Sequence, residues 1–245
     1  MKTIKMIVAY DGTNYAGWQI QPNALTIEEV LNRELSSLLS EDITVHGASR
    51  TDAGVHSLGN IAWFDTNARF DAERIAPALN THLPADIRVL ESCEVSNDYN
   101  PHNIKSKKTY EYRIDNRDVY LPTERLYSYS YHYDLDEKKM DEAIKCLVGE
   151  HDFTAFSSVK AQVKSRVRTI YEAGVRREGD SVIIRIAGDG FLYNMVRIIA
   201  GTLIEIGNGR KEVSDMIKIL ESKDRENAGP TAPPEGLVML GYEEL

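Results

Sequence analysis

The chain has 245 residues, an apolar content of 42% and a formal net charge of -9, a composition typical of a soluble globular protein with one large or two small domains. Its two cysteines cannot form a disulfide framework and lack metal-ligand spacing, which favours a reducing compartment. The N-terminal apolar run is too short for a signal peptide and no later run is long enough to span a membrane, so the sequence predicts a cytoplasmic protein that does not enter a membrane.

The first hundred residues predict strands and helices in the order β-α-β-β-α-β. Thr26 and Glu29 have the spacing of a capping box, and the apolar residues that follow recur on one helical face. Pro77 is expected to bend or shorten the second helix. The predicted strands cover residues 4–10, 43–47, 60–66 and 86–96, and the predicted helices cover 26–39 and 71–83.

The second part of the chain is interpreted as a repeat of the same order. Alternation places the four tyrosines of 127–133 on one face of a strand. Gly149 can end the helix that is predicted at 136–149. Strands are predicted at 108–115, 127–133 and 236–242, a hairpin at 165–177 and 181–188, and helices at 136–149, 191–207 and 214–222. The pattern predicts an α+β fold of two similar halves with antiparallel sheets, domains 1–104 and 105–245, and a central cleft suited to a site.

The stretch SRTDAGVH gathers a cation, a carboxylate and an imidazole around a glycine. Arg50 and Asp52 lie on the same side of an extended backbone, and a nearby guanidinium keeps a carboxylate ionised, which suits a nucleophile or a base. By itself, the local pattern favours a structural Arg–Asp pair in a turn. His46 and His56 are ten residues apart, which is not the short paired spacing of a zinc site, so a metal site is the weaker alternative.

Two distant stretches favour a functional role for this carboxylate. Arg197 lies in an apolar helix and needs a cleft or an acidic partner, unless it snorkels at the helix edge. Asn194, Arg197 and Gly201 fall on one helical face. In KKTYEYRI, Tyr110 and Tyr112 share a strand face beside lysines, where a ring can stack on a base and a cation can hold a phosphate. A core position is the simpler interpretation of either tyrosine alone.

Basic residues gather in two clusters although the net charge is negative. Affinity for phosphate depends on where the cations lie rather than on their sum. A solvated face is the simpler interpretation of either cluster alone. The clusters comprise Lys105, Lys107 and Lys108, and Lys160, Lys164, Arg166 and Arg168.

Stretches spread over nearly the whole chain resemble, in order, the motifs of the tRNA pseudouridine synthase A family. The two most specific motifs are RTDAGVH and FLYNMVRIIAGTL. The others are YDGTNYAGWQIQ, KSKKTYEYRI, GEHDFTAFSS, VRTIYEAGV and TAPPEGLVML.

The resemblance implies an isomerase that converts uridine to pseudouridine at positions 38–40 in the anticodon stem-loop of tRNA, as a homodimer, without a cofactor or a metal. It implies that Asp52 is the catalytic carboxylate acting on a flipped-out uridine. It implies that Arg50 holds the place of the flipped nucleotide or pairs with Asp52, that Tyr110 lies against the target base, and that Arg197 orients Asp52. Both basic clusters are then expected to contact tRNA phosphates.

The chain departs from the family pattern in three places. Ser49 stands where glycine is usual and Asn60 where glutamine is usual, and neither touches the expected chemistry. The stretch YNPHNIKS lacks an arginine that many members have there, and Lys105 can replace it only as a point charge.

Two other classes of protein remain as alternatives. One is a tRNA-binding protein without catalysis, which would release no tritium from C5-labelled uridine. The other is a metal-dependent hydrolase using His46, Asp52 and His56, which a chelator would inactivate.

Overall fold

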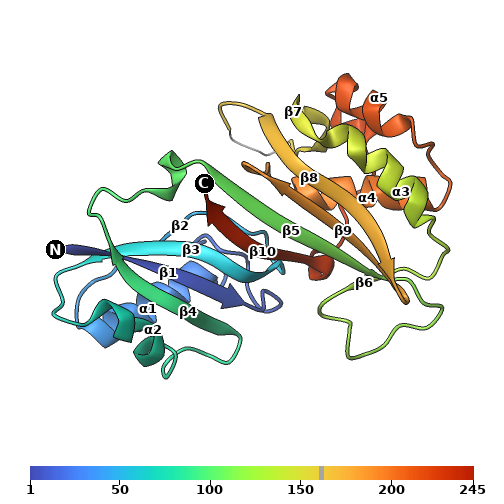
Figure 1. Ribbon diagram of the computed structural model, residues 1–245. Helices are drawn as coiled ribbons and strands as arrows, with labels where there is room; N and C mark the ends of the chain where they lie inside the picture. The colour runs from blue at the N-terminus through green and yellow to red at the C-terminus, as the bar shows by residue number, and fades with distance from the viewer. Residues whose placement is uncertain (160–162) are drawn as a thin grey trace. The chain divides into compact units, whose positions relative to one another are not determined.

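The computed structural model describes residues 1–159 and 163–245 and divides the chain into two compact units (Figure 1). Unit 1 comprises Met1–Lys105 and Met239–Leu245, and unit 2 comprises Ser106–Val238. The first boundary lies one residue beyond the predicted break, whereas the last seven residues, expected in the second domain, lie in unit 1. Both units combine helices with mostly antiparallel strands, so the predicted α+β class is confirmed.

Unit 1 is a sheet covered on one face by two helices (Figure 1). The strand order is β4-β1-β3-β10, and β1 pairs antiparallel with both β3 and β4. The elements follow the predicted order β-α-β-β-α-β. They are β1 Lys2–Tyr10, α1 Ile27–Leu39, β2 His46–Gly47, β3 His56–Thr66, α2 Ala72–Leu79 and β4 Ile87–Val95. The part of β10 Leu237–Glu244 from Met239 onward is added from the end of the chain.

Local side chains determine where the helices of unit 1 begin and end. Thr26 is the N-cap of α1, and its side chain accepts a hydrogen bond from the Glu29 N–H at 3.4 Å, as the capping-box spacing predicts. Pro77 lies inside α2, which ends two residues later, so the prediction of a short helix is confirmed.

The predicted strand at 43–47 is wrong for its first three residues. The N–H of Ile43 donates to Ser36 Oγ at 2.9 Å, and the N–H of Val45 donates to Asn32 Oδ1 at 2.8 Å. These donors therefore bond to polar side chains of α1 instead of to a neighbouring strand, and only His46–Gly47 pairs with β3.

Unit 2 contains strands in the order β5-β9-β8-β7, and its helices pack on one face of them (Figure 1). The predicted repeat of β-α-β-β-α-β is wrong here, because the unit contains further strands and a second helix after β9. β6 adds a short parallel pair to β5. The elements are β5 Ser106–Asp115, β6 Tyr129–Ser130, α3 Glu137–Ile144, β7 Gly149–Asp152, β8 Val167–Glu178, β9 Ser181–Gly188, α4 Met195–Gly207 and α5 Asp215–Ser222.

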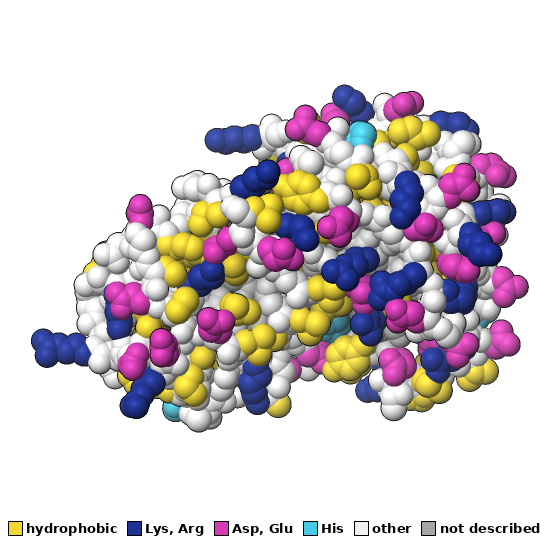
Figure 2. Space-filling model, in the orientation of Figure 1, with side chains coloured by type: hydrophobic (Ala, Val, Ile, Leu, Met, Phe, Trp, Pro, Cys, Tyr) yellow, Lys and Arg dark blue, Asp and Glu magenta, His cyan; other side chains and the backbone are white. Residues whose placement is uncertain are grey.

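Charged side chains of both signs are interspersed over the face drawn in Figure 2, with apolar side chains between them. The 29 basic and 38 acidic residues of the chain therefore do not separate into one acidic and one basic surface on this face. Within the residues that the structure describes, no helix is long and apolar enough to cross a membrane.

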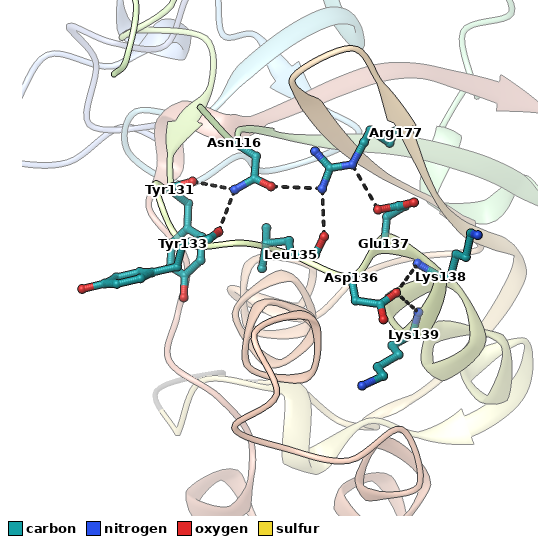
Figure 3. Close-up of polar contacts among 9 residues, drawn as sticks. All are labelled: Asn116, Tyr131, Tyr133, Leu135, Asp136, Glu137, Lys138, Lys139 and Arg177. Carbon is teal, nitrogen blue, oxygen red and sulfur yellow. Dashed lines mark hydrogen bonds and ion pairs between the residues drawn. The ribbon is translucent and has the colours of Figure 1, made fainter. Parts of the chain in front are cut away.

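The predicted strand at 127–133 is also mostly wrong. Only Tyr129–Ser130 is a strand, because the Asn116 side-chain amide donates to Tyr131 O at 2.7 Å and to Tyr133 O at 2.8 Å, where a strand would need a neighbouring backbone (Figure 3). Arg177 then donates to Asn116 Oδ1 at 3.0 Å and to Leu135 O at 2.8 Å. Outside Tyr129–Ser130, the tyrosine-rich stretch is therefore a loop whose carbonyl groups at Tyr131 and Tyr133 are held by a side chain.

Two helix ends in unit 2 differ from their predictions for backbone reasons. α3 ends at Ile144 in a 3-10 turn, Lys145–Leu147, and Gly149 with φ +114° begins β7 instead of closing the helix. α4 begins at Met195 rather than at Phe191, because Asn194 has φ +63° and interrupts the helical backbone.

Candidate active site

Asp52 lies in the loop that joins β2 to β3 in unit 1. Its carbonyl oxygen accepts a hydrogen bond from Val55 N at 3.1 Å, which closes a tight turn. Gly54 in this turn has φ +77°, a backbone conformation that glycine adopts without strain. The Asp52 side chain is half-buried and the Arg50 side chain is exposed. The turn therefore holds a partly accessible carboxylate on a fixed backbone.

A second segment of unit 1, residues 12–18, packs along this loop. The N–H of Trp18 donates to Thr51 O at 3.1 Å, and the N–H of Gly54 donates to Tyr15 O at 3.2 Å. These hydrogen bonds hold the backbone on both sides of Asp52. Sequence reasoning missed this contact, and its one signal is the glycine-containing turn DGTNYAG.

His56, the third polar member of the stretch, is buried at the start of β3. The Gly12 N–H donates to its Nδ1 at 3.0 Å, and Asp11 Oδ1 lies 3.1 Å from the same nitrogen. His46 instead packs its ring against Trp63, with 5.4 Å between the ring centroids. Among the described residues, no group of three or more His, Cys, Asp or Glu side chains is arranged to hold a metal ion.

Tyr110 is buried in unit 2, on the face of β5 that also carries Tyr112. Its ring meets the Phe191 ring edge to face, with 5.0 Å between the centroids. Tyr112 donates its hydroxyl hydrogen to Pro233 O at 2.9 Å, and burial raises its pKa well above the ordinary value. Tyr110 is therefore held in an aromatic pair, beside a tyrosine that anchors the 230–236 segment.

Arg197 is half-buried on α4, and its guanidinium is held by two acceptors of unit 2. Nε donates to Ala232 O at 2.8 Å, and Nη1 donates to Asn194 Oδ1 at 3.0 Å. The Ala232 N–H donates in turn to Arg197 O at 3.1 Å. A Cβ on Gly201 would lie 1.8 Å from Pro230 O, so this glycine is what lets the 230–232 segment approach the helix. Asn194, Arg197 and Gly201 thus act on the same segment, as their predicted common face suggests.

The structure brings together one member of each basic cluster. Lys108 is half-buried, and burial together with the nearby Arg168 guanidinium lowers its pKa to about 8, while Asp189 opposes this shift. Arg168 Nη1 donates to Ser165 O at 3.0 Å and to Val167 O at 2.6 Å.

The remaining basic candidates differ from one another in exposure and in their contacts. Lys107 lies 3.6 Å from Glu172 Oε1. Lys105 and Lys164 are exposed and Arg166 is half-buried. Lys160 lies outside the described residues.

The chain is similar to known proteins over its full length. The family model described as tRNA pseudouridine synthase matches residues 6–101 and 143–243. The tRNA pseudouridine synthase A of Exiguobacterium sp. is 44% identical over 247 residues, covering 100% of both chains. That of Thermoanaerobacter sp. is 42% identical over 240 residues, covering 98% of each chain. That of Halalkalibacterium halodurans is 46% identical over 242 residues, covering 97% of this chain and 91% of its own. Arg50, Asp52 and Arg197 lie within the ranges matched by the family model, and Tyr110 lies between them.

Proposed function

Because the chain belongs to the tRNA pseudouridine synthase family, we propose that it isomerises uridine to pseudouridine at positions 38–40 in the anticodon stem-loop of tRNA. In this reaction the N1–C1′ bond breaks and a C5–C1′ bond forms, while a proton leaves C5 and N1 gains one. One C–N bond is replaced by one C–C bond within the same nucleotide, and the uridine undergoes no net oxidation or reduction. The target uridine must leave the base stack before either bond is accessible, so the substrate is a flipped-out nucleotide.

Asp52 is the proposed catalytic carboxylate. The observation that carries the proposal is its half-buried position in a turn whose backbone is hydrogen-bonded on both sides, by Trp18 to Thr51 and by Gly54 to Tyr15. An ionised carboxylate can attack C1′ of the ribose or the uracil ring, and both routes need a nucleophile with fixed orientation.

Three further side chains are proposed to assist. Tyr110 is assigned to the target base, because a tyrosine already held edge to face against Phe191 can present its ring without loss of side-chain freedom. Arg197 is assigned to orient the Asp52 carboxylate and keep it ionised. Arg50, which is exposed, is assigned to the nucleotide position that the flipped uridine leaves.

Basic residues of the two clusters are proposed to contact tRNA phosphates: Lys105, Lys107, Lys108, Lys160, Lys164, Arg166 and Arg168. Each such contact releases condensed counterions, so binding weakens as salt is raised. We further propose that the protein acts in the cytoplasm and that it is a homodimer. Sedimentation of the full chain with and without tRNA tests the oligomeric state directly.

The deciding experiment measures tritium release from C5-labelled tRNA transcripts that each carry one candidate uridine. Wild-type protein is expected to release tritium from uridines at positions 38–40. Asp52→Asn keeps the shape of the side chain but removes the nucleophilic oxygen charge, so we expect at least a ~1000-fold lower rate with an unchanged Kd for tRNA. Activity of Asp52→Asn within a few-fold of wild type would overturn the assignment.

A matched control separates charge loss from chemistry. Asp42→Asn removes an exposed carboxylate of the same unit and should retain the wild-type rate. Wild-type protein that binds tRNA without releasing tritium would instead be a binding protein, and activity abolished by a chelator would indicate a metal-dependent enzyme.

A further inference from the structure

The segment 10–18 contacts the Asp52 loop at several residues, and three of these contacts meet Thr51, the residue directly before Asp52. Tyr10 ends β1, and its hydroxyl shares a hydrogen bond of 2.9 Å with Thr51 Oγ1. Both side chains are buried. The Thr51 carbonyl is held separately by the Trp18 N–H at 3.1 Å. Thr51 is therefore fixed through its side chain and through its backbone.

The buried environment keeps the Tyr10 hydroxyl protonated. Burial raises the pKa of Tyr10 to about 12, and hydrogen bonds from Thr51, Asn60 and Ser57 only partly oppose this. At neutral pH the phenol thus remains a neutral hydrogen-bonding partner. Because threonine is branched at Cβ, fixing its Oγ1 also fixes its χ1 angle.

Gly17 makes the third contact with Thr51, and its lack of a side chain is what allows this close approach. It has φ +94°, and a Cβ at this position would lie 2.5 Å from Thr51 O and 3.1 Å from the Asp52 carbonyl carbon. The neighbouring atoms are backbone and cannot move aside like the end of a flexible side chain. Only glycine therefore fits against the peptide that joins Thr51 to Asp52.

We propose that Tyr10 and Gly17 are positioning residues, which set the direction of the Asp52 carboxylate by fixing Thr51. This inference rests on the proposed catalytic role of Asp52. Neither residue needs to touch the substrate for this role. Their expected contribution follows from geometry, because a nucleophile displaced by even a fraction of an ångström loses much of its reactivity toward a bound target.

The test is single-turnover tritium release from C5-labelled tRNA with the enzyme in saturating excess. Under these conditions an unfolded fraction of enzyme does not change the rate constant, so the measurement reports on the folded complex alone. Tyr10→Phe should lower the rate constant about tenfold, while the enzyme concentration at half-maximal rate stays within about twofold. Thr51→Val should have the same effect, and Thr51→Ser, which keeps the hydroxyl, should recover most of the loss.

Two further measurements separate positioning from general damage. The double variant Tyr10→Phe with Thr51→Val should be no slower than the slower single variant, because both remove the same hydrogen bond. Tyr99→Phe removes a hydroxyl that bonds to Glu244 elsewhere in unit 1 and should keep the wild-type rate constant.

Gly17→Ala should lower the same rate constant more than Tyr10→Phe does. Gly209→Ala is its control, since Gly209 also has positive φ but a Cβ there would meet no atom within 4 Å. If Gly17→Ala fails to fold, the Tyr10 and Thr51 variants still decide the question. A Tyr10→Phe rate constant equal to wild type, with Asp52→Asn inactive, would overturn the positioning role and leave the proposed function intact. An active Asp52→Asn would instead overturn the function itself.

Discussion

At the scale of single residues, Lys108 is a lysine whose pKa is lowered into a range where a modest change of pH alters its charge. Its pKa of about 8 results first from burial and then from repulsion by Arg168, with Asp189 acting in the opposite direction. A phosphate bound beside Lys108 favours the charged ammonium. Proton uptake therefore accompanies binding above pH 8, and it is not needed well below pH 8, where the side chain is already charged.

This linkage predicts that tRNA affinity falls as the pH rises through 8. With a pKa of about 8, the charged fraction of Lys108 falls about tenfold between pH 7 and pH 9, so Kd should increase by up to about that factor. Lys108→Arg keeps the charge at both pH values and should remove this dependence, whereas Lys107→Arg should retain it. Filter binding at constant ionic strength gives both Kd values. An unchanged pH dependence in Lys108→Arg would contradict the prediction.

A candidate site residue could be predicted from the sequence only where its side chain is unusual among its sequence neighbours. Asp52 and Arg197 carry charges in unusual places, so the sequence identifies both as candidates. Tyr10 and Gly17 have no such signal, because a buried tyrosine and a turn glycine are ordinary, and only the folded contact with Thr51 distinguishes them.

At the scale of elements, α4 depends on the close approach of the 230–232 segment to Gly201. Alanine normally stabilises a helix relative to glycine by about 1 kcal/mol. Here the new Cβ would lie 1.8 Å from Pro230 O, a backbone atom, so overpacking outweighs propensity. We expect Gly201→Ala to lower the free energy of unfolding by about 1–3 kcal/mol, measured by urea denaturation.

The same substitution should also disturb Arg197, because the displaced segment carries the Ala232 carbonyl that accepts from its Nε. Gly241→Ala is the matched control, since a Cβ there meets no atom within 4 Å, and it should leave the urea midpoint nearly unchanged. A Gly201→Ala variant as stable as wild type would show that the segment can move away without cost.

Long elements in which apolar residues recur regularly could be predicted from the sequence, and short polar stretches could not. The α1 pattern with its Thr26 cap, the β8–β9 hairpin and most of α4 are encoded within their own residues. The stretches 43–45 and 131–133 alternate like strands, but Asn32, Ser36 and Asn116 bond to their backbones through side chains. Such partners lie elsewhere in the chain, so alternation alone cannot reveal them.

At the scale of the whole molecule, the net charge of -9 opposes the approach of a polyanion, and local basic clusters must overcome it. Lysines and arginines lie among acids on the face drawn in Figure 2. Because the proposed contacts are a few cations set among many acids, their effect should be clearest in the salt dependence of binding rather than in affinity at one salt concentration.

We therefore predict a linear decrease of the logarithm of the tRNA association constant with the logarithm of salt concentration, with a slope that counts the phosphate contacts. Removing one contacting cation should reduce the slope by about 0.7–0.9. Lys164→Ala, which removes an exposed cation of the second cluster, should show this reduction, and Arg33→Ala, which removes an exposed arginine paired with Glu34 on α1, should not. Titrations at several salt concentrations give each slope. Equal slopes for the wild type and Lys164→Ala would remove Lys164 from the RNA contact surface, and a reduced slope for Arg33→Ala would extend that surface to α1.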